Sequence, residues 1–262
     1  MKTVYIERMS WTDFRAAMEE TDTIIIPLGV MEEHGPHAPL GTDTIIAEHC
    51  AKLIGEATQT PVAPILPYGY AANVKRFPGS TSLDPDTYRK LMVSYCASFI
   101  RHGAKRFLFV NGHGGNSPVL DMIAGDLFDQ FGVITFYTDW WTLVPQIAPE
   151  YNCADHGGYY ETSMLMAANE SLARMDLARG VGECAISDNI RKEYSWRFKG
   201  ATIGICCDVT KFNPVGNLGN PPMGANKELG DKVTQVYVDY NIRLLEEIKK
   251  IPMPIEGVEK TV

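Results

Sequence analysis

The sequence predicts an α/β fold built on a mostly parallel sheet with helices on its faces. Apolar runs of strand length alternate with longer amphipathic segments, and this alternation is typical of parallel strands joined by helices. Polar, glycine-rich loops follow several of these runs, and in such folds ligands bind at the carboxyl ends of the strands. No repeat or linker is visible, so we expect one domain over residues 1–262.

Four apolar runs are expected to form the strands. The first, residues 23–30, is rich in β-branched residues and continuously apolar, as in a strand buried on both faces. After the fourth run the order is less regular, and residues 187–220 are expected to be irregular, with one strand-like stretch near Ile203. The other three strands are expected over 61–66, 106–111 and 133–138.

Helices are expected where apolar residues recur at helical spacing. Ser10, with Asp13 three residues later, approximates a capping box and opens the first helix. Asp84 caps another helix, which Gly103 ends. The remaining helices are expected over 44–56, 119–130, 159–169 and 226–250.

The composition argues against several classes of partner. The net charge is −8 and the basic residues are scattered, whereas binding to nucleic acid needs clustered positive charge. No apolar run approaches the ~18 residues of a membrane span, and the first residues lack the features of a signal peptide. The six cysteines form no CxxC pair, which is typical of buried, reduced thiols. We expect a cytoplasmic protein with a small polar substrate, and neither a nucleic-acid nor a membrane partner.

The densest cluster of acid and imidazole groups directly follows the first expected strand. Residues 32–43 hold three carboxylates and two histidines. Buried carboxylates without partners are costly and clustered ones repel each other, and a divalent cation removes both penalties. On extended backbone Glu32 and His34 point the same way and Glu33 points the other way. We therefore expect Glu32, His34 and Asp43 to bind Zn, Mn or Fe; the alternative is a polar loop in which Asp43 only caps the next helix.

Two further motifs carry histidines. In NGHGGN, His113 follows the third expected strand among glycines and is a candidate fourth ligand. The alternative is a phosphate-binding loop, but the chain has neither a Walker lysine there nor a GxGxxG pattern. In DHGGYYETS, His156 is a candidate general acid or base, and Glu161 is a candidate ligand or partner of the attacking water. The alternative for this second motif is a solvated loop.

Other histidines and aromatic residues are less informative. His49 and His102 lie in expected helices, so we interpret them as structural or surface residues. Trp140 and Trp141 follow the fourth expected strand. One of the two can wall a substrate pocket, and packing in the core or an interface explains each equally well.

Five motifs together resemble the creatininase (creatinine amidohydrolase) family: GVMEEHGPHAPLGTD, FPGSTSL, VNGHGGN, HGGYYETS and GNLGNPPMGANKELG. The resemblance spans residues 23–230. It implies a three-layer α/β/α sandwich with a parallel sheet, a two-metal site and a homo-oligomer that is usually a hexamer. It also implies hydrolysis of cyclic amides, formamides or peptide bonds, with some relatives opening cyclic polyol ketones.

The resemblance also implies a role for each motif residue. Glu32 and His34 each match a ligand of a different metal ion, and Asp43 matches the carboxylate that bridges the two. His113 matches the ligand beside the metal bound by Glu32. His156 matches the histidine that serves as proton shuttle.

One position departs from the family pattern. Gly115 stands where creatininases carry a glutamate that binds the second metal, and Glu161 is the candidate replacement. We expect a metal-dependent amidohydrolase with one or two ions, Zn first and Mn or Fe as alternatives, that cleaves a C–N bond with a metal-activated water. The open alternatives are hydrolytic C–C ring opening of a keto-cyclitol or inosose, a non-catalytic metal-binding protein, and a nucleotide-binding sandwich.

Overall fold

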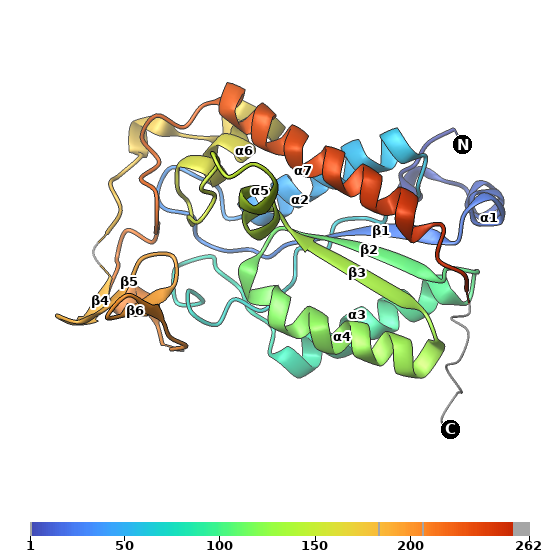
Figure 1. Cartoon of the computed structure of the whole chain (residues 1–262), viewed down its shortest axis with the longest axis horizontal. Coiled ribbons are helices and arrows are strands. Elements are labelled where there is room, and N and C mark those ends of the chain that lie inside the picture. Colours follow the sequence, from blue (N-terminus) through green and yellow to red (C-terminus); the bar gives the residue numbers. More distant parts are fainter. Residues whose placement is uncertain (1, 183, 206, 254–262) are drawn as a thin grey trace.

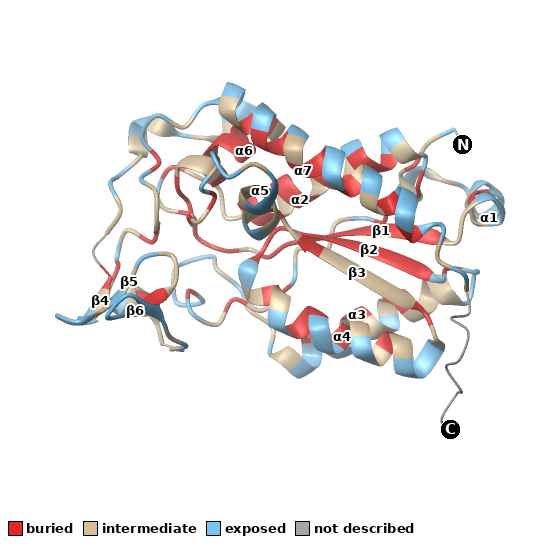
Figure 2. Ribbon diagram, in the orientation of Figure 1, coloured by how far each residue is buried: buried red, intermediate tan, exposed pale blue. Residues whose placement is uncertain are grey.

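The computed structural model describes residues 2–182, 184–205 and 207–253. Its central sheet is parallel, in the order β1-β2-β3, from strands β1 (Thr23–Leu28), β2 (Arg106–Asn111) and β3 (Ile134–Asp139) (Figure 1). β1 and β2 are buried along their whole length (Figure 2), as parallel strands between two helical layers must be. The expected α/β fold is therefore confirmed.

Helices cover both faces of this sheet (Figure 1). Successive strand residues point to opposite faces, so Ile25 and Leu108 pack with one helical layer while Ile24 and Phe107 pack with the other. The first layer contains α2 (Thr42–Thr58), α6 (Tyr159–Asn169) and α7 (Lys227–Ile248), and the second contains α3 (Pro85–Ile100) and α4 (Ser117–Phe131).

The two expected N-caps are also found, whereas the helix expected to end at Gly103 ends at Ile100, with Arg101 as its C-cap. Ser10 and Asp13 form a complete capping box at the start of α1 (Trp11–Glu20), and the Asp84 side chain accepts a hydrogen bond from the Thr87 amide at the start of α3. Not expected were α5 (Trp140–Ile147), which follows β3 without a loop, and five short 3₁₀ turns. These turns are η1 (Ile6–Arg8), η2 (Gly114–Asn116), η3 (Glu170–Leu172), η4 (Met175–Leu177) and η5 (Val209–Lys211).

The prediction of a regular strand over residues 61–66 is wrong. The segment runs parallel to β1 but touches it only through isolated bridges, at Val62 and Leu66. The Ile25 amide donates to the Pro61 carbonyl at 2.9 Å, and the Ala63 amide donates to the Ile25 carbonyl at 2.8 Å. Pro64 has no amide hydrogen, so the hydrogen-bond ladder is interrupted there.

The expectation of irregular chain over residues 187–220 is wrong for its first part, whereas a short strand does lie next to Ile203 and no further strand follows it in the described residues up to 220. Strands of two or three residues form an antiparallel sheet in the order β4-β5-β6-β7 at the end of the molecule opposite α1 (Figure 1). Lys199 and Gly200 both have positive φ, which suits the tight turn between the last two strands. Strands this short show no detectable alternation in the sequence. They are β4 (Ala185–Ser187), β5 (Ile190–Lys192), β6 (Trp196–Phe198) and β7 (Ala201–Thr202).

The five cysteines that the structure describes are free, and four of them are buried, as expected; Cys206 lies outside the described residues. Within the described ranges, no helix has both the length and the apolar character that crossing a membrane requires.

Candidate metal centre

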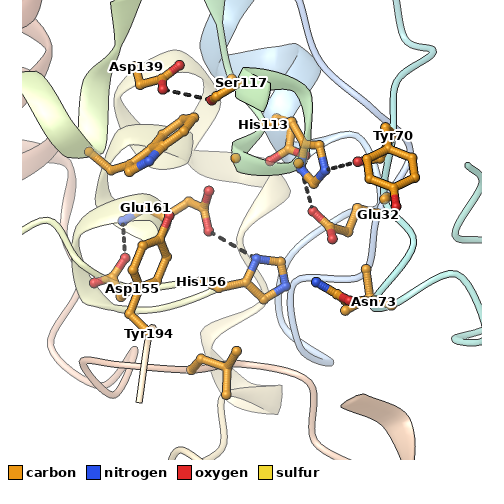
Figure 3. Close-up of a pocket in the computed structure, with 18 of the residues that line it drawn as sticks. Glu32, Tyr70, Asn73, His113, Ser117, Asp139, Asp155, His156, Glu161 and Tyr194 are labelled. Carbon is orange, nitrogen blue, oxygen red and sulfur yellow. Dashed lines mark hydrogen bonds and ion pairs between the residues drawn. The ribbon is translucent and has the colours of Figure 1, made fainter. Parts of the chain in front are cut away.

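The candidate centre lies where the carboxyl ends of β1 and β2 meet. Leu28 and Asn111, the last residues of the two strands, are paired in register, so the loops that follow them start side by side. A Cβ at Gly112 would overlap the Asp43 carbonyl oxygen, so the glycine lets the second loop approach the first turn of α2. This close approach brings His113 to the loop that carries Glu32 (Figure 3).

The described residues contain three groups that could hold a metal ion, one of which joins His156 to Glu32 and His34. The other two share one residue and bring all five expected ligands together. Glu32, Asp43 and His113 form one group; His34, Asp43 and Glu161 form the other. Within each group the ligand atoms lie within 4.8 Å of one another, and all five residues are buried. The first group is called site A below and the second site B.

The imidazole of His34 is held so that one nitrogen faces site B. Its Nδ1 lies 3.0 Å from the Glu32 carbonyl oxygen. A carbonyl can only accept, so Nδ1 carries the hydrogen and Nε2 of the neutral ring carries a lone pair. That Nε2 lies 2.9 Å from Asp43 Oδ1 and 3.5 Å from Glu161 Oε2.

The imidazole of His113 is held in the opposite tautomer. Its Nε2 lies 3.1 Å from the Tyr70 carbonyl oxygen, so Nε2 carries the hydrogen and Nδ1 faces site A. That Nδ1 lies 2.8 Å from Glu32 Oε2 and 3.0 Å from Asp43 Oδ2. In both sites a nitrogen lone pair thus points at carboxylate oxygens.

Lone pairs that converge on carboxylates repel unless positive charge lies between them. His34 Nε2 and Asp43 Oδ2 are buried and have no hydrogen-bond partner in the described part of the chain. Burial lowers the pKa of His34, but the carboxylates of Glu161 and Asp43 outweigh it and hold this pKa well above its ordinary value. Glu32 and Asp43 likewise raise the pKa of His113 against its burial. Without a metal the two sites hold protons, and a set of imidazole and carboxylate donors fits divalent Zn, Mn or Fe.

Glu161 reaches site B through a tight turn before α6. Gly157 has φ +56°, and a Cβ there would come within 2.6 Å of the His34 carbonyl oxygen. The Gly157 amide donates to Glu161 Oε2 at 2.6 Å. Asp155 accepts from the amides of Tyr160 and Glu161 and so caps the helix, and burial, with the charge of Glu161, raises the pKa of Asp155 to about 7.

His156 lies beside site B rather than within either site. Its ring packs on that of His34 with centroids 4.4 Å apart, and its Nδ1 lies 4.0 Å from Glu161 Oε2 (Figure 3). Its Nε2 lies 3.2 Å from Glu33 Oε1. Burial and the neighbouring His34 lower the pKa of His156. The carboxylates of Glu32 and Glu33 outweigh both effects and raise this pKa to about 9. Glu33 belongs to neither metal group, and its contact with His156 was not expected from the sequence.

Gly115 occupies the position where the family pattern has a glutamate. A Cβ at this position would overlap the Tyr70 carbonyl oxygen and come within 2.5 Å of His113 Nε2. The carbonyl that orients His113 therefore takes the space that a side chain would need. Site B contains Glu161 instead.

The two sites open into a cavity of about 460 Å³, a size that suits a small molecule. Trp141 lines this cavity, whereas Trp140 is buried in the core, so one tryptophan walls the pocket and the other packs. Lys192 and Tyr194 also line the cavity, and sequence reasoning missed both because they belong to the small sheet that was expected to be irregular.

Besides His156, three histidines lie outside the two sites. His37 is buried, with Nε2 3.0 Å from Thr162 Oγ1. His49 is half-buried in α2, and His102 is exposed and packs edge-on against Phe14. None of them belongs to a candidate metal group among the described residues, which agrees with the structural interpretation of His49 and His102.

Comparison with protein families gives one match over most of the chain. The model of the creatininase family, described as creatinine amidohydrolase, matches residues 7–245. Solved creatininase structures share the fold: creatinine amidohydrolase itself (TM-score 0.78, 21% identity), a manganese form (0.77, 23%) and a mutant of Zn–Zn type (0.77, 22%). Each alignment covers 95% of this chain and at least 99% of the other.

Three curated relatives have different substrates in their names. Creatinine amidohydrolase of Pseudomonas putida is 29% identical over 196 residues, 67% of this chain and 75% of that one. The 3-dehydro-scyllo-inosose hydrolase of Thermotoga maritima is 29% identical over 167 residues, 63% of this chain and 52% of that one. A mycofactocin precursor peptide peptidase of Mycobacterium tuberculosis is 39% identical over 113 residues, 39% of this chain and 45% of that one. The chain thus matches about half the length of the last two.

Proposed function

Because the chain belongs to the creatininase (creatinine amidohydrolase) family and is a metal-dependent hydrolase, we propose that it cleaves the C–N bond of a small polar amide at sites A and B. The bond is that of a cyclic amide or a formamide. The observation that carries this proposal is the pair of opposed imidazole tautomers, which turn one lone pair of His34 and one of His113 toward the two oxygens of Asp43.

We propose that each site would hold one divalent cation, with Asp43 belonging to both sites. Glu32 and His113 complete site A, and His34 and Glu161 complete site B. The bound cations supply Lewis acidity, which lowers the pKa of a water molecule and polarises the carbonyl of the substrate. Zinc is the first candidate, with Mn or Fe as alternatives that accept the same ligands; the manganese and Zn–Zn creatininase structures support this choice.

His156 is proposed to protonate the leaving nitrogen. The Glu33 carboxylate can only accept a hydrogen bond, so it keeps a hydrogen on Nε2 of His156. A second hydrogen on Nδ1, which the raised pKa of this ring favours near neutral pH, then faces site B and is available for transfer. Glu33 acts through His156 and is therefore a positioning residue.

The small cavity supports a substrate of modest size, but it leaves the scissile bond open to test. The names of two relatives mention creatinine and a precursor peptide, which contain C–N bonds, and one mentions an inosose. The experiment is an assay of the purified, zinc-loaded protein against lactams, formamides, short peptides and keto-cyclitols. Turnover confined to amides supports the proposal, and turnover confined to keto-cyclitols contradicts it.

A second measurement tests the metal sites without a substrate. In the metal-free protein the raised pKa values of His34 and His113 leave protons on both rings near neutral pH. Loading with Zn²⁺ should displace them, releasing about two protons per chain as neutral imidazoles become ligands. Calorimetric titration with Zn²⁺ in buffers of different ionisation enthalpy measures this number. Zinc binding without proton release would contradict the assignment of the two imidazoles as ligands.

We also propose that this single domain forms a homo-oligomer, a hexamer, in the cytoplasm. The family resemblance supports the assembly, and the free thiols of the described cysteines suit a reducing compartment. Light scattering of the protein after gel filtration measures the number of subunits.

A further inference from the structure

The turn between β5 and β6 carries a lysine and a tyrosine into the cavity that contains sites A and B. Lys192, the last residue of β5, and Tyr194, in the turn, both line this cavity. Tyr194 shares the lining of this cavity with Asp155, Glu161 and His156 (Figure 3), and the charges of Glu161 and Asp155 act on its phenol. The small sheet therefore contributes a cationic group to a pocket whose other charged groups come from the large sheet and its helices.

Lys192 is bonded differently from three surface lysines in helices α2 and α7. Lys52, Lys227 and Lys232 pair with carboxylates one helical turn away. Lys192 Nζ instead donates to the Tyr194 carbonyl at 3.0 Å, and it forms no ion pair with a carboxylate of the described residues. Burial lowers the pKa of Lys192, and the charges of Cys184, Cys207 and Glu32 offset only part of this lowering.

An ammonium group has three hydrogens to donate, and the Tyr194 carbonyl accepts one. The ring centroid of Trp196 lies 5.8 Å from Nζ and stabilises the charge. Among the described residues no acceptor is found for the other two hydrogens. Burying a cation without an anionic partner costs free energy. A ligand that brings a carboxylate into the cavity removes this cost and accepts those donors.

We propose that Lys192 binds a carboxylate of the substrate, so that the substrate is a small amide that carries an acid group. This inference rests on the proposed function, because it describes the substrate of the same site. The phenol of Tyr194, whose pKa is raised by burial, stays protonated and is a second donor for the carboxylate. A neutral ring such as creatinine leaves Lys192 without a carboxylate in direct contact.

The experiment compares amides that differ only in their charge. Three pairs share a scissile bond: N-formylglycine and N-formylglycinamide, 5-oxoproline and 5-oxoprolinamide, and hydantoin-5-acetic acid and its amide. Binding of each compound to zinc-loaded protein is measured by calorimetry, and hydrolysis is measured as kcat and KM. The proteins are the wild type, Lys192→Met, Lys192→Arg and the control Lys211→Met, which removes an exposed lysine from η5.

The wild type should bind the acid of at least one pair about tenfold to a hundredfold more tightly than its amide, as for a hydrogen bond to a charged group. Lys192→Met should abolish this preference while keeping its zinc, Lys192→Arg should restore part of it, and Lys211→Met should leave it unchanged. A wild type without preference overturns the proposal, as does a preference that survives in Lys192→Met, which would place the acid on the metal. Loss of zinc from Lys192→Met would assign the residue to the metal centre and also overturn it.

Binding and turnover separate the two proposals. If the acids bind through Lys192 and no compound is hydrolysed, the recognition of the acid group stands and the proposed C–N hydrolysis fails. If amides and acids are hydrolysed with the same KM, the hydrolysis stands and the role of Lys192 fails.

Discussion

Sites A and B share Asp43 but are built from different parts of the chain. The other two residues of site A, Glu32 and His113, follow the adjacent strands β1 and β2, whose register is set by six residue pairs. Site B combines His34 with Glu161, which comes from α6 more than a hundred residues later. Site A is therefore positioned by backbone pairing, and site B depends on how a helix packs.

The packing of α6 depends on close contacts between backbones. A Cβ at Gly230 of α7 would overlap the Ser163 carbonyl of α6, and the turn at Gly157 rests against the His34 carbonyl. Each contact requires a glycine, and each is made only when α6 packs at one particular distance from the neighbouring backbone. We therefore expect site B to be the more easily lost of the two when the fold is perturbed.

The largest effect is expected from Asp43→Asn, because this change acts on both sites at once. The carboxylate loses one negative charge and one acceptor oxygen, so neither cation keeps its shared ligand. We expect the metal content to fall from about two ions per chain to about none, with loss of measurable hydrolysis. Elemental analysis and the amide assay measure this, and a variant that keeps both ions would show that Asp43 does not bridge.

The matched pair Glu32→Gln and Glu161→Gln separates the two sites. Each change removes one carboxylate ligand from one site, so each variant should keep about one ion and lose activity by about a thousandfold. Competition with a chelator should remove the remaining ion more readily from Glu32→Gln, whose intact site is B. The same chelator resistance in both variants would remove the distinction between strand-built and helix-built sites.

Site A could be foreseen from the sequence more fully than site B. The apolar runs before Glu32 and His113 predict adjacent strands, and their carboxyl ends must lie at one edge of a parallel sheet. Apolar runs of strand length and helical spacing also predict β1, β2, β3 and the main helices. The proximity of Glu161 to His34 was expected only from the family resemblance and from the rarity of clusters of histidine and carboxylate residues in the chain. No local sequence pattern predicts how closely α6 packs against the loop that carries His34.

Other features could not be predicted because their cause is not local. The strand expected over 61–66 is interrupted by Pro64, whose missing amide matters only beside a specific partner strand. The small sheet has strands too short to alternate, so Lys192 and Tyr194 could not be assigned to the cavity. The pairing of Glu33 with His156 joins residues 123 positions apart, and the sequence carries no signal for it.

Changing His156 should affect the chemistry without removing either metal. His156→Gln retains an amide group of similar reach but loses the transferable proton, so kcat should fall on the order of a hundredfold with the metal content unchanged. KM should change little, since the substrate is bound by other groups. Loss of one ion from this variant would mean that His156 is a ligand, as its closeness to Glu32 and His34 also permits.

Site A can be weakened selectively through the carbonyl that orients His113. A Cβ in Gly115→Ala would overlap the Tyr70 carbonyl oxygen, so this carbonyl must move and the His113 ring loses its anchor. We expect metal affinity to fall about tenfold to a hundredfold, as for other partners of metal-binding histidines, with a stability loss of about 1–3 kcal/mol. In the control Gly114→Ala the nearest atom is the Tyr194 hydroxyl at 3.5 Å, which is ordinary contact, so both quantities should stay near wild type.

The smallest effect is expected beside site B, from Glu33→Gln. This change removes the carboxylate that helps to raise the pKa of His156 to about 9, while an amide oxygen still accepts the Nε2 hydrogen. A raised pKa keeps the imidazolium present up to higher pH, so lowering it moves the loss of the catalytic proton to lower pH. The alkaline limb of the kcat profile should therefore shift down by about one unit, with the metal content and the activity at pH 6 nearly unchanged. An unshifted limb, or a limb that also persists in His156→Gln, would mean that another group supplies the proton.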